Sequence, residues 1–219
     1  MTRRDFDPTL YLVTDPEITG GRRMIDVVAA ALQGGVSLVQ LRDKAADGRA
    51  LLEVARALKA LLDPCAVPLI VNDRVDVAVA AGAGCHVGQS DLPVEEVRAM
   101  LGPDAILGLS IDRAEQARAV DPEYVDYVAH GPLAATATKP DAGGPVGAGG
   151  IAAARDLTAL PLVAIGGIDA GNAALAIRAG ADGIAVVSAI MAAPDPAAAA
   201  RDLRAAIDAA RAAAKEATR

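Results

Sequence analysis

A repeated alternation of short apolar runs and helix-like stretches is the feature that most constrains this fold. Short runs rich in β-branched residues recur about every 20 to 30 residues, and a stretch of helical character follows each one. We expect eight strands, at Leu10 to Thr14, Val36 to Leu41, Pro68 to Val71, Cys85 to Val87, Ile106 to Leu109, Tyr124 to Val128, Pro161 to Ile165 and Gly183 to Val187. Helices are expected at ranges such as Gly48 to Leu62 and Ala170 to Ala179.

The length and polarity of these runs predict how the strands associate. Runs this short and this apolar are typical of parallel strands that helices cover on both faces. Eight consecutive units predict a closed (β/α)8 TIM barrel, with a doubly wound open sheet as the alternative. The chain of 219 residues would be a compact barrel, because this fold usually has about 250 residues and rarely fewer than about 200. No linker rich in Pro, Gly or Ser divides the sequence, so we expect one domain over residues 1–219.

Composition and charge argue against several classes of partner. The formal net charge is −7 with 21 Lys and Arg, which does not fit a general nucleic-acid surface. The Ala-rich segment from Ala197 to Ala214 is interrupted by charged residues, so we expect an amphipathic helix rather than a membrane span. The early apolar run from Leu10 to Val13 is too short for a secretion signal. These features predict a cytoplasmic protein, and they are compatible with a homo-oligomer.

The two cysteines carry no metal or disulfide pattern. Cys65 and Cys85 are far apart and lack the CxxC spacing of redox or zinc sites. We expect two buried thiols in a reducing cytosol.

Polar and charged residues follow the second apolar run. Side chains two apart on a strand share a face, so one face of this run should change from apolar to cationic along its length. The members of that face are Val36, Leu38, Gln40, Arg42 and Lys44. An amide and two cations at the end of a buried strand need a partner, which an anionic ligand would supply. The segment is therefore a candidate anion-binding site.

The ends of the other runs are polar as well. In a parallel barrel the carboxyl ends of all strands open on one face, so residues that follow different strands converge there. These residues are Gln40, Arg42, Lys44, Asn72, Asp73, Gln89, Asp91, Ser110, Thr136, Thr138, Lys139, Gly166, Gly167, Val187 and Ser188. We expect one functional site at this face.

Asp73 and Asp91 follow neighbouring strands. Carboxylates are the hard oxygen ligands that Mg²⁺ uses together with water and substrate phosphate. Alternatively, each aspartate caps the helix that follows it, since Asp91 directly precedes Leu92-Pro93. The cationic segment on the neighbouring strand favours a metal and phosphate site, in which one diphosphate would satisfy both sets of charges.

The last strands suggest a second phosphate subsite. Gly166 and Gly167, together with Val187 and Ser188, place small residues and backbone N–H groups where barrels commonly bind phosphate. A βα turn that needs unusual backbone angles is the alternative explanation for the two glycines.

The connection over residues 131–150 is long for a βα loop and contains Lys139. Our hypothesis is a mobile lid that brings Lys139 onto the substrate and excludes water.

The two histidines do not indicate a hydrolase. His86 falls in the middle of a strand, where we expect a buried, hydrogen-bonded histidine rather than a catalyst, and His130 ends another strand. Neither has a nucleophile at a diagnostic spacing, and GxSxG does not occur in the chain.

Four ordered motifs identify a family. They are Gln40-Leu41-Arg42-Asp43-Lys44, Leu69-Ile70-Val71-Asn72-Asp73-Arg74-Val75-Asp76, His86-Val87-Gly88-Gln89-Ser90-Asp91-Leu92-Pro93 and Thr136-Ala137-Thr138-Lys139. Together they resemble the thiamine-phosphate synthase family, and the similarity extends from Tyr11 to Ile190. The resemblance implies a TIM-barrel transferase of thiamine biosynthesis. Such an enzyme joins 4-amino-2-methyl-5-(diphosphooxymethyl)pyrimidine to thiazole phosphate, and it yields thiamine monophosphate and diphosphate.

The resemblance also implies residue roles. The pyrimidine diphosphate would be held by Gln40, Leu41, Arg42, Asp43, Lys44, Asn72, Ser110 and Lys139. The thiazole phosphate would be held by Thr136, Ala137, Thr138, Gly167, Val187 and Ser188. Asp73 and Asp91 would bind one Mg²⁺ ion. The residues implied to be catalytic are Arg42, Lys44, Ser110 and Lys139, because the family is thought to release diphosphate before the thiazole nitrogen captures a pyrimidine carbocation.

Two segments depart from the family pattern. Ser110-Ile111-Asp112 stands where Ser-Thr-His or Ser-Cys-His is usual, and Pro132-Leu133-Ala134-Ala135 replaces Pro-Val-Phe-Pro. One alternative is the related thiazole tautomerase, an isomerase on the same barrel that relies on a histidine in the loop after the fifth strand and lacks the full diphosphate and metal set. Asp112 in that region and the presence of Arg42, Lys44, Asp73 and Asp91 favour the synthase over this alternative. A non-catalytic binder of thiamine phosphates is another.

Overall fold

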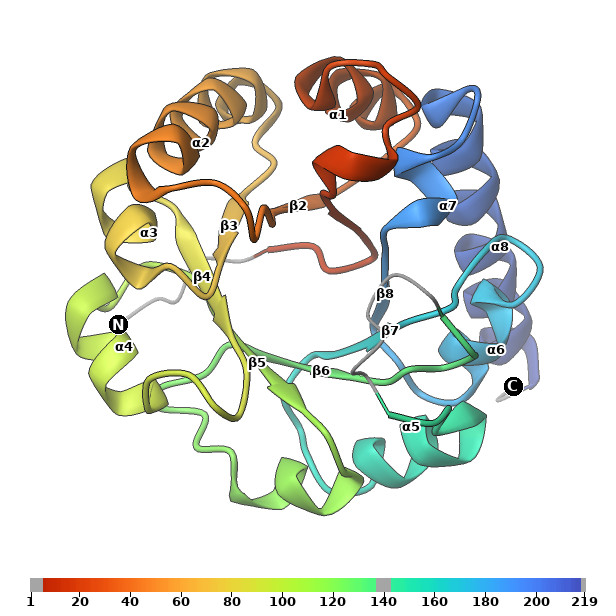
Figure 1. Cartoon of the computed structure of the whole chain (residues 1–219). Coiled ribbons are helices and arrows are strands. Elements are labelled where there is room, and N and C mark those ends of the chain that lie inside the picture. Colours follow the sequence, from red (N-terminus) through yellow and green to blue (C-terminus); the bar gives the residue numbers. More distant parts are fainter. Residues whose placement is uncertain (1–5, 137–142, 218–219) are drawn as a thin grey trace.

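Eight parallel strands close into a barrel in the computed structural model, which describes residues 6–136 and 143–217 (Figure 1). Each strand pairs with the next along the chain, and β8 pairs with β1. The strands are β1 (Leu10–Val13), β2 (Leu38–Leu41), β3 (Leu69–Asn72), β4 (Gly84–Val87), β5 (Leu107–Ile111), β6 (Tyr127–His130), β7 (Leu162–Ile165) and β8 (Gly183–Val186). The predicted (β/α)8 barrel is confirmed, and the open sheet is excluded.

Helices surround the barrel and separate successive strands (Figure 1). The α-helices are α1 (Met24–Gln33), α2 (Gly48–Leu62), α3 (Val75–Ala81), α4 (Val94–Leu101), α5 (Gly147–Arg155), α6 (Ala173–Arg178), α7 (Ser188–Met191) and α8 (Pro196–Ala217). Three short 3-10 helices are η1 (Pro16–Ile18), η2 (Asp63–Cys65) and η3 (Ala114–Ala119). The predicted range of α2 is confirmed, whereas a 3-10 helix rather than an α-helix follows β5.

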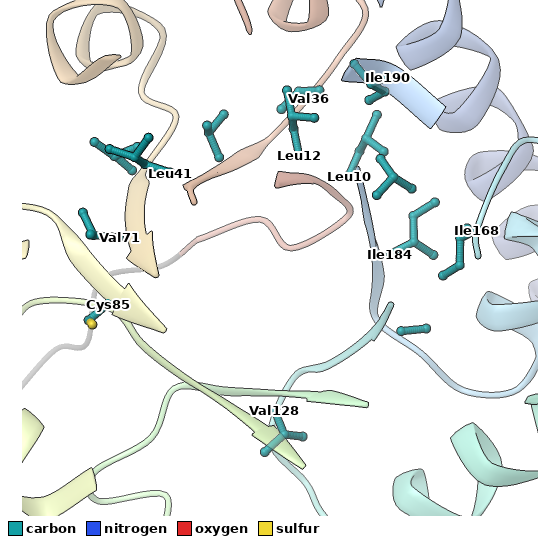
Figure 2. Packing of buried hydrophobic residues seen from close by; sticks show 14 of the residues in the cluster. Leu10, Leu12, Val36, Leu41, Val71, Cys85, Val128, Ile168, Ile184 and Ile190 are labelled. Atoms are coloured by element: carbon teal, nitrogen blue, oxygen red, sulfur yellow. The ribbon is translucent and has the colours of Figure 1, made fainter. Parts of the chain in front are cut away.

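Alternation along each strand divides the apolar residues into two cores. Leu10 and Leu12 of β1 belong to the large cluster between barrel and helices, which Figure 2 shows around the outer side of the strands. Tyr11 and Val13 belong to a smaller cluster inside the barrel. The strands are therefore buried on both faces, which explains why they read as continuous apolar runs.

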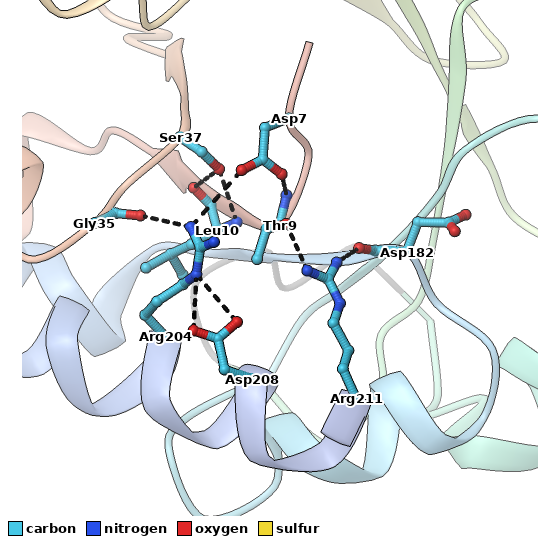
Figure 3. A network of polar contacts seen from close by, with 9 residues as sticks. All are labelled: Asp7, Thr9, Leu10, Gly35, Ser37, Asp182, Arg204, Asp208 and Arg211. Atoms are coloured by element: carbon cyan, nitrogen blue, oxygen red, sulfur yellow. Dashed lines mark hydrogen bonds and ion pairs between the residues drawn. The ribbon is translucent and has the colours of Figure 1, made fainter. Parts of the chain in front are cut away.

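Helix α8 is tied to the amino-terminal end of the barrel by its arginines (Figure 3). Arg211 donates to the Thr9 hydroxyl at 2.9 Å and to the carbonyl oxygen of Asp182. Arg204 donates to the carbonyl oxygen of Gly35 at 3.5 Å and pairs with Asp7 at 3.7 Å. The prediction of an amphipathic helix for the Ala-rich segment is confirmed, and the structure shows that this helix binds the residues that precede β1, β2 and β8. In the described part of the chain, no helix has the length and apolar character needed to cross a membrane.

The prediction of two buried thiols is wrong for one cysteine. Cys85 is buried between β4 and the helices, but Cys65 is exposed on η2, where the chain turns after α2. Burial, and secondly the nearby carboxylate of Asp73, raise the pKa of the Cys85 thiol to about 12. The two thiols should therefore differ strongly in reactivity, since the thiolate is the reactive form.

We expect a thiol reagent such as DTNB to modify one cysteine rapidly in the native protein and two after unfolding. Cys65→Ser should abolish the fast reaction and leave the slow one. Rapid labelling of native Cys65→Ser protein would contradict the burial of Cys85.

Candidate active site

The end of β2 is held in place by the end of β1. The backbone N–H of Arg42 donates to the Thr14 hydroxyl at 3.0 Å, and that hydroxyl is 3.3 Å from the Arg42 carbonyl oxygen. Thr14 is fully buried, so this pair fixes where the chain leaves the barrel. The side chains of Arg42 and Lys44 follow in the loop, partly exposed and exposed respectively, where they can reach a ligand.

The predicted continuous face from Val36 to Lys44 is wrong. β2 begins at Leu38 and ends at Leu41, so strand alternation relates only Leu38 and Gln40. Val36 packs in the outer cluster, whereas Leu38 packs inside the barrel. The cations reach the carboxyl face because the loop starts there, not because they continue a strand face.

Asp43 stabilises this loop. Its Oδ1 accepts the backbone N–H groups of Ala45 and Ala46 at 3.0 and 3.1 Å. One oxygen of a residue that was predicted to bind substrate is thus occupied in shaping the turn that carries Arg42 and Lys44. Asp47 then begins α2 by accepting the Ala50 N–H at 2.9 Å.

Asp73 and Asp91 come together after β3 and β4. The two carboxylates lie within hydrogen-bonding range of each other, and Asp73 also interacts with the Asn72 side chain and with the charge of Lys44. Burial, and then the neighbouring Asp91 carboxylate, raise the pKa of Asp73 above its ordinary value. The pair is therefore a concentration of negative charge that Lys44 offsets only in part.

The backbone conformation and hydrogen bonds around Asp73 and Asp91 hold the two carboxylates together. Asp73 adopts a left-handed conformation with φ of +60°, which is uncommon outside glycine, and its N–H donates to the carbonyl oxygen of His86 at 2.9 Å. Asp91 accepts the Gly88 N–H at 2.7 Å through Oδ2. Helix capping, the alternative role, is wrong for both residues, because the cap positions of α3 and α4 are Arg74 and Pro93.

This acid pair fits a divalent cation. Two adjacent carboxylates gain from a cation that neutralises their repulsion. Among the described residues no group of three or more His, Cys, Asp or Glu side chains is placed so that it could hold a metal ion. Two carboxylates with the remaining positions left to water and phosphate oxygens is the pattern that Mg²⁺ commonly adopts.

The loops after β4 and β5 are joined by two glutamines. Gln89 Nε2 donates to the Ser110 carbonyl oxygen at 2.7 Å, and Gln116 Nε2 donates to Gln89 Oε1 at 3.0 Å. Gln116 Oε1 accepts the N–H groups of Asp112 and Arg113 at 2.8 and 2.9 Å. Gln116 was not predicted from the sequence, although its place three residues after Arg113 is the spacing of a capping box.

The loops after β6 and β7 run side by side. Leu133 N–H donates to the Ile165 carbonyl oxygen at 2.9 Å, and Ala134 N–H donates to that of Gly166 at 3.1 Å. Gly166 and Gly167 have φ of +89° and +66°. A Cβ on Gly167 would also collide with the Ala134 and Ala135 carbonyl oxygens. The unusual backbone angles are therefore confirmed, and they bring Gly167 close to the segment that leads to Thr136.

The remaining predicted residues are in two places. Val187 and Ser188 form the junction of β8 and α7, and the exposed Ser188 begins the helix. Ala137, Thr138 and Lys139, with most of the centre of the predicted lid, lie outside the described residues.

A chain of hydrogen bonds crosses the barrel beneath this face. Gln40 Nε2 donates to Tyr11 Oη at 2.7 Å, and Tyr11 Oη is 2.8 Å from Tyr127 Oη. Tyr127 Oη is 2.9 Å from His86 Nδ1, and His86 Nε2 is 2.8 Å from Ser110 Oγ. The prediction of a buried, hydrogen-bonded His86 is confirmed. The roles of Tyr11 and Tyr127 were not predicted, because they depend on strands that lie across the barrel.

The structure also has a cavity at the opposite end of the barrel. It has a volume of about 450 Å³ and is lined by Asp7, Pro8, Thr9, Arg155, Ala159, Pro161, Asp182 and Arg211. Arg155 pairs with Asp182 at 2.8 Å, and Arg211 is bonded to Thr9. These cations are already engaged in fastening the amino-terminal face, which in this fold usually serves stability.

Comparison with known proteins shows the family of this chain. The family profile described as thiamine monophosphate synthase matches residues 10–190. A thiamine-phosphate synthase of Xanthobacter autotrophicus is 57% identical over 95% of this chain and 99% of its own, and one of Azorhizobium caulinodans is 55% identical over 94% and 98%. The solved structure of a thiamine phosphate pyrophosphorylase from Pyrococcus furiosus superposes with a TM-score of 0.84 at 32% identity, covering 93% of this chain and 97% of that one. The chain therefore belongs to the thiamine monophosphate synthase family, as its motifs predicted.

Proposed function

We propose that this protein is a transferase that condenses 4-amino-2-methyl-5-(diphosphooxymethyl)pyrimidine with thiazole phosphate to give thiamine monophosphate and diphosphate. The observation that carries the proposal is the Asp73 and Asp91 pair beside the loop of Arg42 and Lys44, at the carboxyl face of a barrel of this family. A diphosphate with a divalent cation complements both the carboxylates and the cations.

The pyrimidine diphosphate would lie between the loops after β2, β3 and β5. Arg42 and Lys44 would contact the diphosphate, and Ser110 and Asn72 would complete its polar contacts. Loss of diphosphate breaks the bond between the pyrimidine methylene carbon and a diphosphate oxygen, and both electrons leave with that oxygen. The cations stabilise the charge that develops there, so electrostatics and positioning supply the catalysis.

The thiazole phosphate would lie against the loops after β6, β7 and β8. Thr136, Gly167 and Ser188 come from these loops, and the described hydrogen bonds keep the first two loops adjacent. In that position the thiazole nitrogen can donate its electron pair to the methylene carbon and form the new C–N bond. Ala137, Thr138 and Lys139 belong to the same proposed site by sequence.

Asp73 and Asp91 would hold one Mg²⁺ ion. When bound, the ion would neutralise diphosphate oxygens and make diphosphate a better leaving group. The raised pKa of Asp73 is the local support for this assignment.

The departures in the loops after β5 and β6 do not favour another reaction. Asp112 is exposed, and its backbone N–H is bonded to Gln116. It offers no imidazole for the tautomerase chemistry, while Arg42, Lys44, Asp73 and Asp91 are all present. The synthase is therefore favoured over the isomerase, and a non-catalytic binder is an outcome that the assay below distinguishes.

We also propose a cytoplasmic location, because Cys65 is an exposed free thiol and suits a reducing compartment. Small-molecule substrates are the proposed partners.

The first prediction concerns the reaction itself. With both substrates and Mg²⁺, the protein should form thiamine monophosphate and diphosphate in equal amounts, and EDTA should stop both because the acid pair then lacks its cation. Diphosphate would be measured by a coupled assay and thiamine monophosphate by chromatography. Saturable substrate binding without either product would instead identify a binding protein.

A second prediction concerns Lys139. Lys139→Ala should lower turnover by about 10² to 10³, the usual effect of removing one group that stabilises a developing anion. Lys59→Ala is the matched control, because Lys59 is on α2 and pairs with Asp63 at 2.8 Å. Equal turnover of the two variants would remove the proposed role of Lys139.

A third prediction uses Asp91→Asn, which retains an oxygen for the Gly88 N–H. Without the neighbouring charge, the pKa of Asp73 should fall toward its ordinary value. In the metal-free wild type, Asp73 has a higher pKa in the folded protein than in the unfolded chain. At pH values between these two pKa values the folded protein therefore binds more protons, and its stability falls as pH rises. The variant should show a smaller loss of stability, because burial still raises the pKa of Asp73.

Melting temperatures in EDTA as a function of pH would measure this effect. As pH rises through the range between the two pKa values, the melting temperature of the variant should increase relative to that of the wild type. The variant should also bind Mg²⁺ about tenfold more weakly, because it has lost a charged ligand. Asp63→Asn, at an exposed ion pair, is the control. Unchanged Mg²⁺ affinity in Asp91→Asn would contradict the metal assignment.

A further inference from the structure

The hydrogen-bond chain inside the barrel connects two residues of the proposed active site that do not touch each other. Gln40 on β2 and Ser110 on β5 form its ends, and Tyr11, Tyr127 and His86 form its middle. Tyr11 and Tyr127 are at most 1% exposed, so a ligand on the carboxyl face cannot contact them. Gln40 is 5% and His86 6% exposed, and Ser110 is partly exposed.

The direction of every bond in the chain follows from its first member. Tyr11 Oη accepts from Gln40 Nε2, and among the described residues its other partner is Tyr127. The Tyr11 hydroxyl therefore donates to Tyr127, and the Tyr127 hydroxyl donates to His86 Nδ1. A neutral imidazole that accepts at Nδ1 carries its proton on Nε2, which then donates to Ser110 Oγ.

Burial keeps both tyrosines protonated. It raises the pKa values of Tyr11 and Tyr127 above that of an ordinary phenol. Each phenol therefore has a hydrogen to donate at any physiological pH, and the order of donors and acceptors is maintained.

The residues around Tyr127 pack closely against this chain of hydrogen bonds and hold its members in place. A Cβ on Gly108 of β5 would collide with the Tyr127 hydroxyl and with His86 Nδ1, the two atoms of the central bond. The Tyr127 ring also stacks on His86 with ring centroids 5.4 Å apart, and it meets Tyr11 edge-on at 5.9 Å. The chain contains only three tyrosines, and two of them occupy this interior.

We propose that Tyr11, Tyr127 and His86 are positioning residues that set the hydrogen-bonding polarity of the two ligand-facing ends. They leave the Gln40 amide oxygen as an acceptor and the Ser110 hydroxyl as a donor. This inference rests on the proposed function, in which the pyrimidine diphosphate meets both ends. A pyrimidine amino group matches the acceptor, and an anionic diphosphate oxygen matches the donor. If the Gln40 amide were reversed, every bond in the chain would reverse, and His86 would carry its proton on Nδ1.

The tautomer of His86 is thus a direct test that needs no activity. Long-range ¹H–¹⁵N correlation spectra of protein labelled at histidine would show which ring nitrogen is protonated. The chain has two histidines, and His130 Nδ1 donates to the Ile111 carbonyl oxygen at 3.0 Å. We therefore expect opposite tautomers, with the proton on Nε2 in His86 and on Nδ1 in His130. A proton on Nδ1 of His86 would overturn the proposal.

Removal of single hydroxyls tests the middle of the chain. Tyr127→Phe and Tyr11→Phe should each allow both His86 tautomers, because either substitution breaks the hydrogen-bonded connection between the Gln40 amide and the imidazole. Both variants should lower kcat/KM for the pyrimidine diphosphate by about 10- to 100-fold, the cost of misplacing groups that contact a substrate. KM for the thiazole phosphate should not change, whereas a general structural defect would alter the kinetic constants for both substrates.

Tyr124→Phe is the matched control, because Tyr124 lies outside the barrel against the outer cluster. It should leave both the spectrum and the kinetics unchanged. Wild-type kinetics in folded Tyr127→Phe protein would overturn the positioning role, and if that variant does not fold, Tyr11→Phe and the wild-type spectrum decide. Absence of thiamine monophosphate formation by the wild type would refute the proposed function alone, since the His86 tautomer is read without substrate.

Discussion

Closure of the eight parallel strands is the constraint on which the rest of the structure depends. A closed barrel has no free edge, and each strand has one row of side chains facing the helices and one facing the interior. The outer row can be wholly apolar. The inner row is confined to a narrow space, where one added methyl group at Gly108 would collide with two neighbours.

The interior of this barrel combines that tight packing with polar side chains. Tyr11, Tyr127 and His86 are buried, and in the described part of the chain no fully buried polar side-chain atom lacks a partner. Such a network is costly if one member is lost, because a buried donor or acceptor without a partner destabilises the fold by about 1 to 3 kcal/mol. The same requirement makes the network rigid, and its ends at Gln40 and Ser110 are correspondingly well positioned.

The two ends of the barrel have different roles: the amino-terminal end contributes to stability, and the carboxyl end carries the proposed site. At the amino-terminal end, Arg204 and Arg211 of α8 donate hydrogen bonds to Gly35 and Thr9, which precede β2 and β1. At the carboxyl end, Asp73 and Asp91 repel each other, and Asp73 has a backbone conformation that is uncommon outside glycine. Repulsion between neighbouring carboxylates, with an uncommon backbone conformation at one of them, is expected of a site that binds a charged ligand.

Much of this could be predicted from the sequence. The βα repeat predicted the barrel, because burial on both faces imposes a local apolar pattern on every strand, and α2 was predicted from Gly48 to Leu62 for a similar reason. The motifs identified the family, and placement of residues after strands predicted the face at which Asp73 and Asp91 meet. Local patterns sufficed where a residue's environment depends on its neighbours in sequence.

Other features were decided only by the tertiary structure. Cys65 is exposed and Cys85 is buried because one ends a helix at the surface and the other faces α-helices from β4, although their local sequences did not separate them. The cationic face predicted along residues 36–44 failed because β2 starts and ends within it. The pairing of Tyr11 with Tyr127, 116 positions apart, requires the barrel to close. Sequence determined which strands form and in what order, whereas closure determined which side chains meet across the interior, because those contacts join residues that no local pattern connects.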